Sequence, residues 1–393
     1  MPRLSVRLLV LLLGVGGGAV ACSDQTGPGT TILSRGQVAV GFNHTCFLNV
    51  EGRMRCWGWG GLGQLGNGAI LNSNTGDPTW RSPQAVLSDI PLIQVDAGAN
   101  HTCALSVDGD AYCWGAKVYG ELGNGESLGF QTEPVAVSGG LRFKELNVGD
   151  GHTCALTEAG EVYCWGLGVA GQLGNGGTAD KSTPVAVSST VRFTDISAGF
   201  NSTCGVANDG QIYCWGDNFW GQLGNGTVGS FSADPTPVSG TVRFRSVSVG
   251  AFVVCGVTQA RDGYCWGSGS FGRLGTGENL NGVVPNPALV ATGLKYESLE
   301  VGAQHTCGVT IDRAMYCWGL NTYGKLGDDI GPAGYEPILV SGGHTFVDVG
   351  AGSNHSCGLT TSNEVYCWGQ NFLGQLGVPG QTKPTFRPLR VVL

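Results

Sequence analysis

Short alternating runs of apolar and polar residues recur along the whole chain after its N-terminal stretch, and glycine or proline separates them. In the third copy of the pattern the runs are Pro134–Val137, Phe143–Val148, His152–Thr157 and Glu161–Trp165. Such short runs with a two-residue alternation are typical of β-strands, whereas a helix needs a longer apolar period. The pattern predicts an all-β protein built from units of four short antiparallel strands.

The cysteines give the period of these units. Fourteen of the 15 cysteines fall into pairs whose members are ten residues apart, and successive pairs begin 50 to 57 residues apart. The pairs are Cys46 with Cys56, Cys103 with Cys113, Cys154 with Cys164, Cys204 with Cys214, Cys255 with Cys265, Cys307 with Cys317, and Cys357 with Cys367. Seven copies of a unit near 50 residues long predict a ring of seven blades, a β-propeller.

Each cysteine pair brackets a predicted hairpin. In the second copy the turn is Val107–Gly109, and an x-Asp-Gly triplet suits a three-residue hairpin loop with glycine in the left-handed conformation. If Ser106 faces Asp110, then Cys103 faces Cys113, and a disulfide can bridge that distance. The fifth to seventh copies have Arg261, Arg313 and Asn363 in place of that glycine, so there the register rests on spacing alone.

Two interpretations of the fourteen paired cysteines differ in chemistry. Thiolates could hold zinc, but each pair lies across one hairpin and the N-terminus has the features of an export signal. Exported proteins meet oxidising surroundings. We therefore predict seven disulfides, each contributing about 2–3 kcal/mol by the loop-entropy estimate.

Arg3, Arg7 and the apolar stretch Leu8–Val15 form that export signal, which is too short to span a membrane. The segment before Cys22 resembles a bacterial lipobox, and cleavage there would leave the Cys22 thiol carrying lipid. Ala19 and Ala21 also fit an ordinary signal peptidase site, so secretion is the alternative. The unpaired Cys22 favours the lipid anchor, because a free thiol is a liability on an exported protein.

These observations predict three segments and a location. Residues 1–21 are the lipoprotein signal peptide, 22–31 a flexible tether rich in polar residues, glycine and proline, and 32–393 the propeller. The location expected is the bacterial cell envelope, with the protein lipid-anchored at the outer membrane or cell surface.

Composition narrows the range of partners. Glycine accounts for 69 of the 393 residues, which indicates many turns and little helix. The net charge is −8 with only 21 Lys and Arg, and no basic run follows the signal, so a nucleic-acid partner is not expected. No second apolar stretch approaches the length of a membrane span.

The recurring string H-T-C-A-L-T…G-x-V-Y-C-W-G…G-Q-L-G-N-G, present at 152–157, 160–166 and 171–176, resembles the repeat of the regulator of chromosome condensation family. The likeness extends over about residues 32–393 and implies a seven-bladed propeller. The nuclear member of that family is a nucleotide-exchange factor, and some similar exported bacterial propellers inhibit β-lactamases. Fold alone does not decide between such functions.

The two ends of the repeat region suggest how the ring closes. The first copy lacks the Pro-Val strand that opens the others, whereas Pro388–Leu393 follows a completed seventh copy. We expect this C-terminal strand to join the first blade, removing two open sheet edges.

No constellation in the sequence indicates catalysis, and we predict no catalytic, cofactor-binding or metal-binding residues. The three G-x-G-x-x-G matches lack the following helix of a dinucleotide site and are interpreted as blade turns. Histidine precedes the first cysteine of five pairs by two residues, at His44, His101, His152, His305 and His355. We expect each to hold its own blade by hydrogen bonds, with a metal or proton site as the alternative. The Cys-Trp-Gly tryptophans are expected to pack between blades rather than to bind ligands.

The loops after G-Q-L-G-N-G vary most and carry lone aromatic residues. These candidates for partner binding are Trp80, Phe130, Phe231, Tyr335 and Phe386. Exposed aromatic side chains on variable loops are common in protein-binding surfaces. The alternative is that each folds back onto its own blade. We therefore expect a monomeric, non-enzymatic scaffold that binds a protein or a surface glycan; a nucleotide-exchange factor and a propeller hydrolase are the alternatives.

Overall fold

Seven four-stranded antiparallel sheets make up the structure. The computed structural model describes residues 33–71, 78–329 and 331–393, and residues 31–393 form one compact unit. The signal peptide predicted over 1–21, the tether over 22–31 and Cys22 lie outside the described residues.

The four strands of each sheet follow one another in the chain, so each sheet is one blade. Blade one is β1 (Gln37–Val40), β2 (His44–Leu48), β3 (Met54–Gly58) and β4 (Gln84–Ala85). Blade two is β5 (Leu92–Ala97), β6 (His101–Ser106), β7 (Ala111–Ala116) and β8 (Phe130–Ala136). Blade three is β9 (Glu145–Val148), β10 (His152–Leu156), β11 (Val162–Gly166) and β12 (Lys181–Ala186). Blade four is β13 (Phe193–Ala198), β14 (Ser202–Ala207), β15 (Ile212–Gly216) and β16 (Ser232–Pro237).

Blade five is β17 (Phe244–Val249), β18 (Val253–Thr258), β19 (Gly263–Ser268) and β20 (Val283–Leu289). Blade six is β21 (Tyr296–Val301), β22 (His305–Thr310), β23 (Met315–Leu320) and β24 (Ala333–Leu339). Blade seven is β25 (Phe346–Ala351), β26 (His355–Thr360), β27 (Val365–Gly369) and β28 (Thr385–Arg390). Four 3-10 helices lie in the loops: η1 (Pro78–Arg81), η2 (Ser270–Gly272), η3 (Ala291–Gly293) and η4 (Thr322–Gly324).

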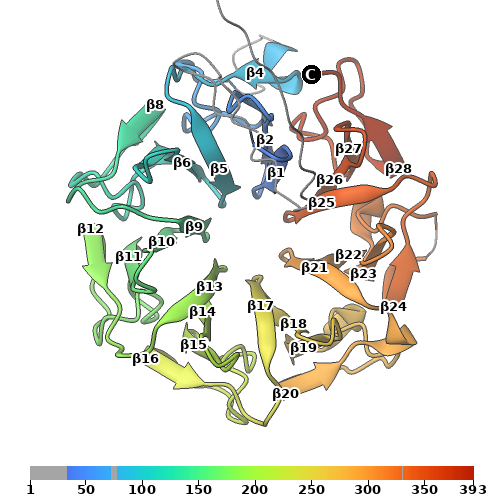
Figure 1. Ribbon diagram of the computed structural model, residues 1–393. Coiled ribbons are helices and arrows are strands. Elements are labelled where there is room, and N and C mark those ends of the chain that lie inside the picture. Colours follow the sequence, from blue (N-terminus) through green and yellow to red (C-terminus); the bar gives the residue numbers. More distant parts are fainter. Residues whose placement is uncertain (1–32, 72–77, 330) are drawn as a thin grey trace, which may run out of the picture. The chain divides into compact units, whose positions relative to one another are not determined.

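The blades stand around a central axis, and the first strand of each blade is innermost (Figure 1). The seven-bladed, all-β propeller predicted from the sequence is therefore confirmed. No helix in the described ranges is long and apolar enough to cross a membrane.

Blade boundaries differ from the predicted ones. Pro134–Val137 was expected to open the blade of Cys154, but β8, which contains Pro134, pairs with β7 and is the outermost strand of the preceding blade. The apolar alternation locates a strand but does not say which sheet accepts it, because strand pairing across a long loop leaves no local signal.

The predicted ring closure is wrong for the same reason. Pro388–Leu393 was expected to join the first blade, but β28 pairs with β27 inside blade seven, and blade one already has four strands. Side chains close the ring instead. The Val38 N–H donates to Asp348 Oδ2 at 2.9 Å, and Val391 shares a buried cluster with Val38 and Trp57 of blade one.

The predicted hairpin register is confirmed. Cys103 lies opposite Cys113 with their Cα atoms 4.1 Å apart, and the structure joins them in a disulfide. The other six pairs have the same opposed register, and the structure joins each of them in a disulfide as well. They are Cys46 with Cys56, Cys154 with Cys164, Cys204 with Cys214, Cys255 with Cys265, Cys307 with Cys317, and Cys357 with Cys367.

The turns of these hairpins share one backbone conformation. Gly109 has a φ of 81°, and Arg261, Arg313 and Asn363 take the same left-handed conformation in blades five to seven. The spacing of ten residues therefore keeps its register where the turn glycine is missing.

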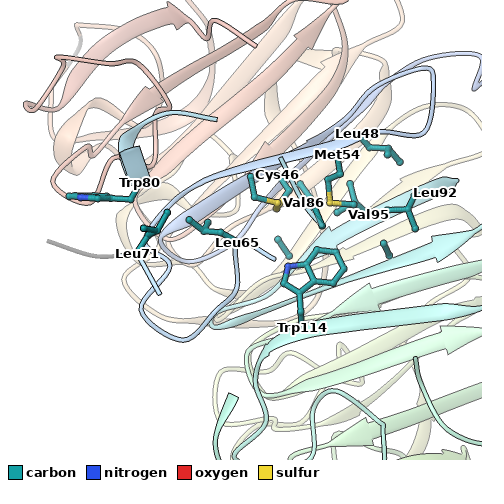
Figure 2. Packing of buried hydrophobic residues seen from close by; sticks show 14 residues of the cluster. Cys46, Leu48, Met54, Leu65, Leu71, Trp80, Val86, Leu92, Val95 and Trp114 are labelled. Carbon is teal, nitrogen blue, oxygen red and sulfur yellow. A yellow bond between two sulfur atoms is a disulfide. The ribbon is translucent and has the colours of Figure 1, made fainter. Parts of the chain in front are cut away.

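Neighbouring blades pack through the Cys-Trp-Gly tryptophans, all seven of which are fully buried. Trp114 of blade two lies in a cluster with Cys46, Leu65 and Val86 of blade one (Figure 2). Its indole N–H donates to the carbonyl of Gln64 at 3.0 Å, and the other six tryptophans make the equivalent bond to the preceding blade. The predicted packing role between blades is confirmed.

The histidine and the hydroxyl residue before the first cysteine form a second hydrogen-bonded link between neighbouring blades. This link ends on the same backbone carbonyl that accepts the tryptophan N–H. His101 Nε2 is 2.9 Å from Thr153 Oγ1 of the next blade, and that hydroxyl donates to the carbonyl of Glu121. The imidazole must therefore donate through Nε2, and burial lowers the pKa of His101 to about 3. The equivalent pairs are His44–Thr102, His152–Thr203, His305–Ser356 and His355–Thr45. Each histidine thus holds the next blade, not its own as predicted.

Side chains also satisfy the free edge of each innermost strand, where backbone N–H groups have no strand partner. Asp96 Oδ2 accepts the Val148 N–H at 2.7 Å, and Gln94 Oε1 accepts the Leu146 N–H at 3.0 Å. Similar bonds join most neighbouring blades around the axis. The polar side chains around the axis therefore hold the blades together.

Candidate functional site

One end of the ring carries two sets of loops. Because the strands of a blade are antiparallel, the turn between its first and second strands and the loop after its third strand emerge together. In blade one the Trp59 N–H donates to the carbonyl of Asn43 at 2.9 Å, which joins the two loops. The disulfide hairpins lie at the opposite end. We call the end with the paired loops the loop face.

The glutamine of G-Q-L-G fixes the shape of the loop after the third strand. Its amide oxygen accepts the N–H of the residue two positions earlier, as in Gln222 and Trp220 at 2.8 Å. Gln64, Gln172 and Gln375 make the same bond, and the carboxylate of Glu121 replaces the amide in blade two. The bond fixes the backbone of the residue before the first glycine.

Blades five and six depart from this arrangement because they carry a cation at that position. Neither Arg273 nor Lys325 can accept an N–H. Their loops form η2 and η4, and the residues before the glycine, Phe271 and Tyr323, have φ values of 59° and 68°. In each of these two loops a cationic side chain replaces the accepting amide, and the aromatic residue before the glycine is exposed with a left-handed backbone.

Large apolar side chains are exposed on this loop face. They are Phe42, Val118, Tyr119, Val169, Phe200, Phe219, Phe271, Tyr323 and Phe372, and we call them the collar. Every blade contributes at least one collar residue, which in blade five is Phe271. Large apolar side chains gathered at one end of a soluble protein mark a candidate interaction site.

Aromatic contacts at the loop face cross the boundary between blades four and five and the boundary between blades six and seven. Trp220, half-buried, lies between Phe219 and Phe252 with ring centroids 5.1 and 5.9 Å apart. Tyr323 of blade six meets Phe372 of blade seven edge to face at 5.4 Å. These contacts hold the rings in fixed positions, which lowers the entropy lost when a partner covers them.

The central channel opens within the collar, and Phe42 and Phe200 line both. It is a cavity of about 590 Å³ whose walls carry the carboxyls of Asp96, Glu300 and Asp348 among others. Burial raises the pKa of Asp96 and Asp348 to about 6, and that of Glu300 well above its usual value.

These channel carboxyls already have structural partners. Asp96, Asp348 and Glu145 accept backbone N–H groups of the next blade, as does Asp195 on the innermost strand of blade four, and Glu300 lies 3.3 Å from the Ser248 hydroxyl. Within the described ranges no group of histidine, cysteine or acidic side chains has the arrangement of a metal site. The hydrogen bonds of these carboxyls therefore join neighbouring blades around the axis.

Sequence comparison assigns the chain to a family. A model of the RCC1-like domain matches residues 85–393, and models of the regulator of chromosome condensation (RCC1) repeat match residues 37–64 and 51–105. The chain belongs to the RCC1 family. Its seven blades, Cys-Trp-Gly tryptophans and G-Q-L-G loops are thus those of an RCC1 propeller.

Two relatives within the RCC1 family are longer than the region that matches this chain. The chain is 30% identical to the ultraviolet-B receptor UVR8 of Arabidopsis thaliana over 311 residues, covering 78% of this chain and 58% of the receptor. It is 30% identical to the human E3 ubiquitin-protein ligase HERC2 over 323 residues, covering 80% of this chain and 6% of the ligase. The chain thus spans less than two thirds of either relative.

A solved structure shows the same fold. In the crystal structure of Kap60 bound to yeast RCC1 (Prp20), a chain matches with a TM-score of 0.76 and 20% identity, covering 97% of this chain and 91% of that one. At this level of identity the likeness concerns the fold of the RCC1 propeller and not its partner.

The aromatic residues predicted from the variable loops have mixed outcomes. Phe130, Phe231, Tyr335 and Phe386 are exposed, at or beside the start of outermost strands, and Tyr335 and Phe386 also pack against the glycine loops of the preceding blades. The expected exposure of Trp80 is wrong. It is 4% exposed, because η1 lays its indole against Gly374 of blade seven and the Arg81 guanidinium covers the ring at 4.3 Å.

The collar itself was missed in the sequence. Its main signal is a large apolar residue one or two positions before the first glycine of G-Q-L-G or its variant, inside a loop instead of a strand. Those residues are Val118, Tyr119, Val169, Phe219, Phe271, Tyr323 and Phe372. Because they fall outside the strand alternation, they look like turn residues until the loops of all blades are seen to share one face.

Proposed function

We propose that this RCC1 propeller is a non-enzymatic, monomeric scaffold of the bacterial cell envelope that binds a protein partner through its collar. The observation that carries the proposal is the set of exposed, largely aromatic side chains that all seven blades contribute to the loop face around the channel mouth, with Tyr323 and Phe372 in contact across a blade boundary. Aromatic residues dominate the energetics of protein interfaces, and rigid rings lose little entropy on binding. A surface glycan is the other partner class, but the collar offers it few polar side chains.

The names of relatives fit a binding role. UVR8 is named a receptor, and yeast Prp20 was crystallised with Kap60. HERC2 is named a ligase, but the region matched is 6% of its length. The structural use of the channel carboxyls favours binding over a hydrolase, and no feature of the described residues favours nucleotide exchange in an exported protein.

The location is part of the same proposal. Seven disulfides are typical of proteins in oxidising, extracytoplasmic surroundings. We propose that residues 1–21 export the chain and that lipid on Cys22 holds it at the envelope. Cys22→Ala should move the protein from the membrane fraction to the soluble one, together with loss of the lipid mass from the N-terminal peptide. An unmodified Cys22 in membrane-bound protein would contradict the anchor.

The binding role is tested with two triple variants of the full chain. The collar variant carries Phe219→Ala, Phe271→Ala and Tyr323→Ala, and the control carries Phe130→Ala, Phe231→Ala and Phe386→Ala at similarly exposed positions outside it. Proteins captured from envelope extract by the wild-type chain should bind the collar variant at least about tenfold more weakly and the control with unchanged affinity. Equal loss in both variants, or loss in the control alone, would overturn the collar as the binding surface.

A further inference from the structure

Arg273 is a buried cation without an acidic partner. Only 8% of its surface is exposed, and within the described ranges it forms no ion pair. One terminal nitrogen donates to Ser268 Oγ at 3.0 Å, while Nε is buried without any hydrogen-bond partner. Buried charges in folded proteins are usually paired, because desolvation without compensation is costly.

Two collar-side rings hold the guanidinium in place. Its carbon lies 5.1 Å from the ring centroid of Phe252 and 5.3 Å from that of Phe271, which is 49% exposed. Stacking between aromatic faces leaves the edge of a guanidinium, with its N–H donors, as the part available to an acceptor. A carboxylate meets such an edge with two parallel hydrogen bonds.

The neighbouring cation in blade six is different. Lys325 is fully buried and its Nζ is 2.9 Å from Asn354 Oδ1, 3.3 Å from the Ser353 carbonyl and 3.4 Å from Gln304 Oε1. Its donors are therefore satisfied by neutral oxygens. Burial, and to a lesser extent the charge of Arg273, lowers the pKa of Lys325 to about 7, so Arg273 carries the more persistent positive charge beneath this part of the collar.

Folding does not require a cation at the position of Arg273. Gln64, Gln172, Gln222 and Gln375 occupy the same position in other blades, where the amide accepts an N–H within its own loop and each loop is closed without a buried charge. Arg273 instead places a desolvated charge in the loop, stacked on the rings of Phe252 and the exposed Phe271. This arrangement points to a ligand group that pairs with the charge.

We propose that the protein partner supplies an aspartate or glutamate carboxylate to Arg273, flanked by apolar residues that cover Phe271 and Tyr323. The inference rests on the collar being the binding surface and specifies the chemistry of the partner there. The apolar flanks exclude water from the ion pair, and a desolvated ion pair gains strength as the local dielectric falls.

The test uses random linear peptides displayed on phage and selected on the full chain. Selected peptides should contain Asp or Glu next to apolar residues. Arg273→Gln, which restores the side chain of four other blades, should weaken their binding by about 30-fold or more. Lys325→Gln, the matched control in the next blade, should change it by no more than about twofold. Circular dichroism and melting of both variants check that the ring stays folded.

A double-mutant cycle separates an ion pair from a structural effect. With the peptide acid changed to its amide, Arg273→Gln should have almost no further effect, and Arg273→Lys should recover part of the affinity for the acidic peptide. Peptides that lack acids and lose binding only in the collar triple variant would overturn the carboxylate but leave the binding surface intact. Selected peptides that bind the collar triple variant as well as the wild type would overturn both proposals.

Discussion

At the scale of single residues, each hairpin turn requires a left-handed backbone at its last position, and three blades adopt it without glycine at a cost in free energy. Blades one to four have glycine at the last position of the turn, where φ is positive, whereas Arg261, Arg313 and Asn363 take this conformation in blades five to seven. The left-handed conformation costs a residue with a Cβ roughly 1 kcal/mol or more. The cysteine pairs keep the same opposed register in those three blades, so pairing and packing outweigh the strain.

Arg313→Gly should therefore stabilise the protein. Relief of the left-handed backbone exceeds the extra entropy that glycine gains in the unfolded chain, and we expect about 0.5–1 kcal/mol in the free energy of unfolding. Reversible denaturation in urea, with the disulfides kept oxidised, measures it. The control is Asp312→Gly in the same turn, where no positive φ is relieved and a loss is expected. A destabilised Arg313→Gly would show that the turn is not strained.

At the scale of elements, the outermost strands combine pairing with protection of the sheet edge. Six of them contain proline, which lacks the N–H that another strand would need: Pro134, Pro184, Pro235, Pro285, Pro337 and Pro388 are examples, one from each of blades two to seven. Proline on an edge strand prevents the sheet from extending to another molecule. In blades three to seven a buried valine follows the same strand, such as Val391 after β28, which packs into the core shared with the next blade.

Deletion of 388–393 should destabilise the ring, although not for the reason predicted from the sequence. It removes the pairing of Leu389 and Arg390 with β27 and takes Val391 out of the core between blades seven and one. We expect a loss of at least about 2 kcal/mol. Deletion of the exposed Val392 and Leu393 alone is the control and should cost less than about 0.5 kcal/mol. Equal melting temperatures for the two truncated chains would contradict this role.

At the scale of the whole molecule, two sets of buried titratable groups, the histidines and the channel carboxyls, make the stability of the ring depend on pH with opposite signs. Burial lowers the pKa of His44, His101, His152 and His355 to about 3, and lowers that of His305 well below its ordinary value. Below the ordinary histidine value of 6.5 the unfolded chain takes up protons that the folded ring refuses, so acid destabilises the ring. Burial raises the pKa of the channel carboxyls, so they hold protons in the folded ring that the unfolded chain has released.

This balance predicts falling stability from neutral to mildly alkaline pH. Above the ordinary histidine value Lys325, whose pKa burial lowers to about 7, works against this trend, but it is outnumbered by three carboxyls with strongly raised pKa, Glu145, Asp195 and Glu300. These carboxyls lose their protons as the pH rises through their folded pKa, and the stability linked to those protons is lost. The melting temperature should decrease between about pH 6.5 and about pH 9, and Glu300→Gln should make the decrease shallower. A melting temperature that stays constant or rises over this range would contradict the assignment of buried, protonated carboxyls.

The sequence by itself determined the number of blades, the hairpin register and the cysteine pairing, because each depends on residues at most about one repeat apart. Only the tertiary structure decided which sheet takes each Pro-Val strand, that β28 stays in blade seven, and that Trp80 is buried against Gly374. The collar also became visible only there. Its residues lie in loops without strand periodicity, and they form one surface because ring geometry brings the same loop of every blade to the same end. Contacts between neighbouring blades join residues far apart in sequence, and no local pattern of apolar and polar positions encodes them.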